Sequence, residues 1–194
     1  MKMAFDALAD VSDDALLVLY GNGDTDAARA LTQRLLPRVL GFATRMLNDA
    51  TEAEDVAQEA MLRLWKIAGD WRQGEAKVST WLYRVVLNLC TDRQRKRKGI
   101  GLDQISEPED ETPGAVAGLQ EQERLAALKD ALAALPDRQR QAVVLRHIEG
   151  FTNPEIAQVL EISVEAVESL TARGKRSLEV LLAGKRAELG YTDD

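Results

Sequence analysis

Polar and charged residues with a distinctive spacing come together in one stretch near the end of this 194-residue chain. Between Glu155 and Arg176, apolar residues recur at the spacing of two short helices joined by a tight turn, and Ser163 is placed to cap the second helix. In a helix-turn-helix, the first residues of the second helix face base edges, and later basic residues meet phosphates. The corresponding set here is Glu165, Glu168, Ser169, Thr171, Ala172, Arg173, Lys175 and Arg176. A plain helical hairpin without DNA contacts is the alternative.

Three acidic residues are unusual for that motif. Glu161 occupies the turn where glycine is usual, and a left-handed backbone at any other residue costs about 1 kcal/mol. Glu165 and Glu168 repel phosphates, although a carboxylate can accept a hydrogen bond from the N4 amine of cytosine. These two residues therefore either contribute to base recognition or reduce stray DNA binding.

A second basic surface is predicted on a helix that starts near Thr80, where Ser79 can act as the cap. Its inward face is expected to hold Leu82, Val85, Val86 and Leu89, and its outward face Arg84, Asn88, Thr91 and Arg95. The helix ends in the run Arg93-Gln-Arg-Lys-Arg-Lys98. Residues 20–98 carry 14 basic against 10 acidic side chains, a surplus of +4 in a chain of net charge −7. A locally basic block in an acidic chain indicates a protein that binds DNA only with a partner's help.

The sequence favours binding over catalysis. No side chains form a recognisable catalytic arrangement, and no glycine-rich phosphate loop is present. Cys90 is the only cysteine and His147 the only histidine, so we expect no intramolecular disulfide and no metal site. We likewise expect no enzymatic activity, no cofactor and no small-molecule substrate. No apolar run reaches the roughly 20 residues of a membrane span, and the first ten residues lack a signal-peptide pattern, which predicts a cytoplasmic protein without membrane insertion.

Helical periodicity runs through almost the whole chain and predicts an all-α fold. The expected helices cover about residues 13–20, 26–47, 51–66, 80–98, 119–135, 137–148, 153–160 and 163–182. Residues 99–118 combine glycine, proline and five acidic residues with no basic one, which indicates a flexible acidic linker. The prediction is two small helical domains, residues 12–98 and 119–184, joined by that linker.

One predicted helix has an unusual polar face. A capping box of Thr51 and Glu54 is expected to start it, and its apolar stripe holds Val56, Ala57, Ala60, Met61 and Leu64. The opposite face holds Asp55, Gln58, Glu59, Leu62 and Lys66. Leu62 is either an ordinary surface leucine or the centre of a docking face.

Five segments, taken together and in this order, resemble the extracytoplasmic-function sigma factors of bacterial RNA polymerase. They are Leu35-Leu-Pro-Arg-Val-Leu-Gly-Phe42, Ala53-Glu-Asp-Val-Ala-Gln-Glu-Ala-Met-Leu-Arg-Leu-Trp65, Ser79-Thr-Trp-Leu-Tyr-Arg-Val-Val-Leu-Asn88, Leu135-Pro-Asp-Arg-Gln-Arg140 and Phe151-Thr-Asn-Pro-Glu-Ile-Ala157. The resemblance covers almost the whole chain. It implies a sigma region 2 domain and a sigma region 4 domain, which bind core RNA polymerase and promoter DNA to direct promoter-specific initiation. It also implies regulation by an anti-sigma factor.

The resemblance further assigns roles to individual residues. Docking on the clamp helices of the largest polymerase subunit is assigned to Asp55, Gln58, Glu59, Leu62 and Arg63. Capture and melting of the minus-ten promoter element is assigned to Trp71, Arg72, Arg84, Asn88, Arg93 and Arg95, since melting needs a held base and a basic track for its strand. The helix-turn-helix is expected to read the minus-thirty-five element, and the acidic linker to pass near the catalytic cleft of the polymerase.

We consider two other classes of protein, a sigma mimic, which stays open, and a conventional repressor. A sigma mimic keeps the fold and sequesters an anti-sigma factor but never binds DNA. Glu161, Glu165 and Glu168 favour such a mimic, whereas the basic run from Arg93 to Lys98 argues against it. A conventional repressor needs a dimer and an effector pocket, and the sequence leaves room for neither.

Overall fold

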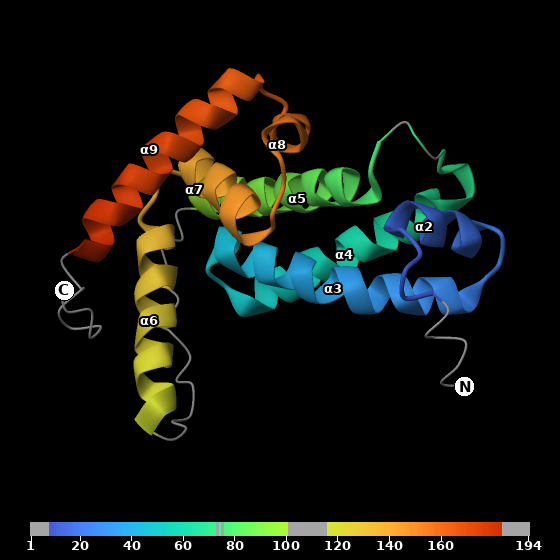
Figure 1. Cartoon of the computed structure of the whole chain (residues 1–194), viewed down its shortest axis with the longest axis horizontal. Coiled ribbons are helices and arrows are strands. Elements are labelled where there is room, and N and C mark those ends of the chain that lie inside the picture. The colour runs from blue at the N-terminus through green and yellow to red at the C-terminus, as the bar shows by residue number, and fades with distance from the viewer. Residues whose placement is uncertain (1–7, 73, 75, 101–115, 184–194) are drawn as a thin grey trace. The chain divides into compact units, whose positions relative to one another are not determined.

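The computed structural model describes residues 8–72, 74, 76–100 and 116–183 (Figure 1). Every regular element within these residues is helical, which confirms the all-α prediction. The α-helices are α2 (Asp13–Gly21), α3 (Thr25–Leu47), α4 (Ala50–Ile67), α5 (Val78–Ile100), α6 (Val116–Ala133), α7 (Asp137–Val143), α8 (Asn153–Leu160) and α9 (Val164–Ala183). A 3-10 turn, Ala68–Asp70, follows α4, and a π-helical turn, Val144–Ile148, continues α7.

The chain forms two compact units, one with α2 to α5 and the other with α6, α7, α9 and most of α8. Residues 101–115, the middle of the predicted linker, lie outside the described residues, while the ends of that linker belong to α5 and α6. None of the described helices is both long and apolar enough to cross a membrane.

The core of the first unit lies between α3, α4 and α5. α3 contributes Leu31, Leu35, Val39 and Phe42, and α4 contributes the whole predicted stripe of Val56, Ala57, Ala60, Met61 and Leu64. The ring of Phe42 lies 5.0 Å from that of Tyr83 on α5, measured between centroids. Each fully buried large apolar side chain adds about 1.5–3 kcal/mol, so this packing fixes which faces of α4 and α5 remain outside.

The inward face of α5 differs in part from the prediction. Leu82 and Val86 are buried as expected, but Val85 and Leu89 are only half-buried. Tyr83, Leu87 and Cys90 are buried instead. The prediction weighed only aliphatic residues, whereas the packing also encloses a tyrosine ring and a thiol.

Two helices of the first unit start differently from the prediction. At α4, the carboxylate of Asp49 accepts a hydrogen bond from the backbone N–H of Glu52 at 3.0 Å, so Asp49 rather than Thr51 is the cap. At α5, the backbone N–H of Val78 donates to Asp14 Oδ1 at 3.0 Å. This partner lies on α2, 64 residues earlier, and the helix therefore starts before the predicted cap at Ser79.

In the second unit, α9 packs against α6 and α7. Gly174 permits the contact with α7, because a Cβ at that position would lie 2.5 Å from Val143 Cγ2 and 3.3 Å from the carbonyl oxygen of Gln139. Val167 of α9 is buried in the same unit. The role of Gly174 was not predicted, since nothing in the neighbouring sequence distinguishes this glycine from a weak helix former.

Each helix of the helix-turn-helix segment starts with a capping side chain. Ser163 Oγ accepts from the backbone N–H of Ala166 at 3.2 Å, which confirms the cap of α9. At the start of α8, Thr152 donates to the Glu155 carboxylate from its N–H at 2.8 Å and from its hydroxyl at 2.7 Å, so Thr152 is the cap of this helix. Between the helices, Glu161 has a φ of 55°, the left-handed conformation predicted for this turn.

Candidate nucleic-acid interface

The face of α4 opposite its buried stripe is exposed, polar and centred on one leucine. Leu62 is 54% exposed, and Asp55, Gln58 and Arg63 around it are exposed too. Glu59 accepts a hydrogen bond from Arg63 Nε at 2.8 Å, and this bond lowers the pKa of the Glu59 carboxyl. The structure therefore brings together all five residues predicted to dock on the polymerase.

The loop before α5 carries the two candidates Trp71 and Arg72. Trp71 is half-buried, and its ring lies edge-on to that of Trp81 at a centroid distance of 6.3 Å. Its indole N–H is buried and has no hydrogen-bond partner within the described part of the chain. Arg72 is exposed. The loop thus combines a held aromatic side chain with an exposed cation, next to the start of α5.

The outward face of α5 carries the predicted basic row. Asn88 and Arg95 are exposed, and Arg84 and Thr91 are half-buried. With about 100° of rotation per residue, these four side chains lie within a narrow stripe on the side away from Leu82 and Val86.

The last turns of α5 contain ion pairs that the sequence did not reveal. Arg93 pairs with Glu52 and, at 3.5 Å, with Asp55, both on α4. Arg97 pairs with Asp49 and, at 3.9 Å, with Glu52. Gln94 Nε2 donates to the carbonyl oxygen of Met46 at 2.9 Å.

These contacts shift two pKa values in the direction that favours the charged pair. The hydrogen bond to Glu52 raises the pKa of Arg93. The backbone N–H of Glu52, with Arg97 as a further contributor, lowers the pKa of Asp49. The only sequence signal of this network is the acidic content of the first turns of α4, which could equally have been a helix-dipole effect.

The two predicted glutamates in the first turns of α9 make different contacts. The carboxylate of Glu165 accepts from its own backbone N–H and from the Ser163 hydroxyl, and both bonds lower its pKa. Glu168 is exposed, and its Oε1 lies 3.5 Å from the amide nitrogen of Asn153. Glu165 is thus folded back onto the helix start, while Glu168 remains on the outer surface.

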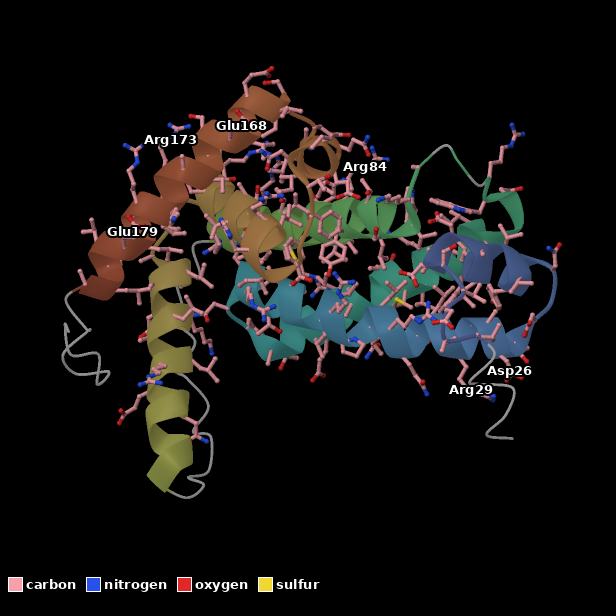
Figure 2. The ribbon with its side chains drawn as sticks, in the orientation of Figure 1. Asp26, Arg29, Arg84, Glu168, Arg173 and Glu179 are labelled. Atoms are coloured by element: carbon pink, nitrogen blue, oxygen red, sulfur yellow. The ribbon has the colours of Figure 1, made fainter. Side chains whose placement is uncertain are left out.

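Further along α9, the other candidates are distributed over two faces. Ser169, Ala172, Arg173, Lys175 and Arg176 are exposed. Thr171 is half-buried with a buried hydroxyl, which directs it away from the outer surface. Lys175 lies 3.9 Å from Glu179. Figure 2 shows Glu168, Arg173 and Glu179 following one another along α9.

Comparison with known proteins identifies the family. Residues 31–100 match the sigma-70 region 2 family model, and residues 125–178 match the sigma-70 region 4 model. The RNA polymerase sigma-H factor of Pseudomonas aeruginosa is 30% identical over 187 residues, which span 90% of this chain and 96% of that protein. The chain belongs to the extracytoplasmic-function sigma factors. SigW of Bacillus subtilis, which carries that description, is 33% identical over 174 residues, 80% of this chain and 89% of its own.

Solved structures agree with this assignment. CnrH, solved in complex with the cytosolic domain of CnrY, is 28% identical with a TM-score of 0.66, covering 89% of this chain and 97% of its own. The sigma factor RpoE of Bartonella quintana has the same fold at 23% identity and a TM-score of 0.68, covering 80% of this chain and 96% of its own. The resemblance seen in the sequence is therefore confirmed, and with it the role of a promoter-directing sigma factor. The region 2 match contains the exposed face of α4 and the basic row of α5, and the region 4 match contains the helix-turn-helix.

Proposed function

We propose that this sigma factor docks on core RNA polymerase through the exposed face of α4 and reads promoters with two separate surfaces. The observation that carries the proposal is Leu62, which is 54% exposed among charged residues on a helix whose other face is buried. Protein interfaces commonly have an apolar centre with a polar rim, and Leu62 with its charged neighbours has this arrangement. Residues 12–98 form the region 2 domain in this proposal, residues 99–118 the linker and residues 119–184 the region 4 domain.

The first DNA surface captures and melts the minus-ten element. We assign it to Trp71, Arg72, Arg84, Asn88, Arg93 and Arg95. Support comes from the outward stripe of α5, in which Asn88 and Arg95 are exposed, and from the aromatic pair Trp71 and Trp81 beside the start of this helix. A base taken out of the stack gains about 1–3 kcal/mol on an aromatic surface, which offsets part of the cost of unpairing it.

The second DNA surface reads the minus-thirty-five element with α9. We assign it to Glu165, Glu168, Ser169, Thr171, Ala172, Arg173, Lys175 and Arg176. Within that set, the exposed side chains Glu168, Ser169 and Ala172 suit base edges, and Arg173 and Arg176 suit phosphates. We assign Glu165 a role at the helix start, where its carboxylate accepts two hydrogen bonds, and Thr171 a role in packing, because its hydroxyl is buried.

Docking is tested with purified core polymerase. Leu62→Ala should weaken binding to core about tenfold or more, because a buried hot-spot side chain contributes at least about 1.4 kcal/mol. Leu19→Ala is the matched control, since Leu19 is an exposed leucine on α2 of the same unit. If Leu62→Ala and Leu19→Ala bound core polymerase with equal affinity, α4 would not be part of the interface.

Promoter recognition is tested by run-off transcription on a genomic library with core polymerase. The sigma factor should yield transcripts from a discrete set of promoters, whereas a sigma mimic should yield none. The triple variant Arg93→Ala, Arg95→Ala and Arg97→Ala should abolish those transcripts. Tight promoter binding by the chain without core would contradict the proposal.

The proposal also includes a regulatory partner and a place of action in the cell. We propose that an anti-sigma factor holds this chain inactive, as the complexes of CnrH with CnrY and of RpoE with the anti-sigma factor NepR suggest by analogy. We place its action in the cytoplasm, where polymerase and chromosome are found. The factor itself needs no catalytic residue, because in this proposal the polymerase performs the chemistry.

A further inference from the structure

We infer that Arg93 and Arg97 position the DNA-facing end of α5, and that Arg95 is the side chain of this basic run that meets promoter phosphate. The inference rests on the proposed function and divides the basic run into two roles. It assigns Arg93 to the minus-ten surface as a positioning residue rather than as a DNA contact.

Helix geometry places the two groups on opposite sides of α5. At about 100° per residue, Arg93 and Arg97 continue the row of Leu82, Val86 and Cys90, which are buried in the first unit. Arg95 lies on the far side and continues the row of Arg84, Asn88 and Thr91. The two arginines that extend the core row therefore project toward α4, and Arg95 projects toward solvent.

The acidic partners of Arg93 and Arg97 are all on or beside the first turns of α4. Arg93 and Arg97 side chains are 29% and 36% exposed, and those of Asp49 and Glu52 are 21% and 33% exposed. Because Glu52 lies between the two arginines and contacts both, the pairs form one network instead of two isolated bridges. Networks of partly buried charges hold a geometry better than single surface pairs do.

A further contact joins the same end of α5 to α3. Gln94 donates to the carbonyl oxygen of Met46, in the last turn of that helix. Asp49, which pairs with Arg97, also caps α4, so the end of α5 is tied to the point where α3 ends and α4 begins. A helix end that must present a cation to DNA gains from such ties, because helix termini otherwise fray.

Arg95 and its neighbour Lys96 differ from these residues. Both are exposed, and neither makes an ion pair with any described residue. Cations without internal partners can exchange their counterions for phosphate without first breaking a protein contact. Within the basic run, Arg95 and Lys96 are therefore available to bind phosphate, whereas Arg93 and Arg97 are engaged by acids.

The first test neutralises the acids, which cannot themselves bind phosphate. Asp49→Asn with Glu52→Gln keeps the cap of α4, because asparagine caps as well as aspartate does. Promoter affinity is measured at saturating core polymerase, so that altered docking does not contribute. We expect a several-fold loss of affinity, together with faster amide hydrogen exchange in residues 93–97. Unchanged or higher affinity would overturn the inference. In the alternative, Arg93 and Arg97 bind DNA directly and the acids compete with DNA for them, so neutralising the acids would free both arginines and raise the affinity.

The second test uses the salt dependence of promoter binding. Each phosphate contact contributes about 0.9 to the slope of log affinity against log salt concentration. Arg95→Ala should lower that slope by about one, whereas Arg93→Ala should reduce affinity at every salt concentration and leave the slope unchanged. A slope change of about one for Arg93→Ala would assign that arginine to DNA and overturn the inference.

The third test exchanges the charges of one pair. Arg93→Glu alone should lower promoter opening at least tenfold, and Arg93→Glu with Glu52→Arg should restore it to within a few-fold of the wild type. Recovery of thermal stability without recovery of promoter opening would contradict a positioning role. The wild-type chain tests the proposed function separately. If the wild type forms no active holoenzyme with core polymerase, the proposed function fails, whereas the three tests above concern only how Arg93 and Arg97 hold the end of α5.

Discussion

Replacing Gly174 by alanine should weaken the contact between α7 and α9 and destabilise the second unit. The new Cβ would lie 2.5 Å from Val143 Cγ2 and 3.3 Å from the Gln139 carbonyl oxygen, distances that require one helix to move. Such overpacking costs about 1–3 kcal/mol, and alanine recovers up to about 1 kcal/mol through its better helix propensity. We expect a net loss of about 1–2 kcal/mol, which corresponds to a lower melting temperature by roughly 4–8 °C per kcal/mol for a unit of this size.

The protein provides an internal control for this measurement. All three tryptophans, Trp65, Trp71 and Trp81, belong to the first unit, so tryptophan fluorescence follows the unfolding of that unit alone. Circular dichroism follows the helices of both units. In Gly174→Ala, we expect an earlier loss of helical signal with an unchanged fluorescence transition.

A double-mutant cycle identifies the cause of the loss. Val143 is buried, and Val143→Ala alone should cost about 1–3 kcal/mol. Because that substitution removes the methyl group nearest the new Cβ, the double variant should be at least about 1 kcal/mol more stable than the sum of the two single effects predicts. An additive cycle, or a Gly174→Ala variant as stable as the wild type, would refute the close-approach argument.

Three further predictions concern the turn and the helix caps. Glu161→Gly should raise stability by up to about 1 kcal/mol in urea unfolding, because glycine adopts the φ of 55° without strain, whereas Glu161→Ala should not. Asp49 has a lowered pKa in the folded chain, so its contribution is complete above its ordinary pKa and is lost as the pH falls below about 4; the unfolding free energy of Asp49→Asn should therefore fall less between pH 5 and pH 3 than that of the wild type. Asp14→Ala should cost about 0.5–2 kcal/mol and reduce promoter opening in transcription assays, whereas Asp14→Asn, which keeps an acceptor for the Val78 N–H, should retain most of both.

Sequence patterns predicted the features that depend on local chemistry. Apolar periodicity correctly predicted the buried stripe of α4. The position of Glu161 in the turn, where glycine is usual, correctly predicted its left-handed backbone. The cap of α9 at Ser163 was also correct, because cap and helix are adjacent in the chain. The positions predicted for docking on polymerase share one exposed face for the same reason, since a helix brings together residues three and four apart.

The features that were missed depend on contacts between distant segments. Asp14 caps a helix that starts 64 residues later, and no local pattern relates the two. Gly174 is required by a side chain on another helix, and its own neighbours in the sequence give no sign of this. The basic run at the end of α5 appeared uniform in the sequence, although Arg93 and Arg97 contact acids that lie 38 to 48 residues earlier, while Arg95 does not. Tertiary packing, not residue type, decides which of these arginines is available.

The same pairing changes how the net charge of −7 bears on DNA binding. At physiological ionic strength, charges more than about 8 Å apart are largely screened, so acids elsewhere in the chain do little to repel DNA at α5. The local balance matters more, and there Arg93 and Arg97 are already neutralised by Asp49, Glu52 and Asp55. With Arg93 and Arg97 engaged by acids, the free chain should show a lower affinity for DNA and a smaller salt slope than the number of basic residues in this run implies. In the holoenzyme, most of the slope of log promoter affinity against log salt concentration should then come from basic groups of the polymerase. Promoter binding by this factor would therefore depend on core polymerase even though the DNA-binding surfaces of the factor are already folded.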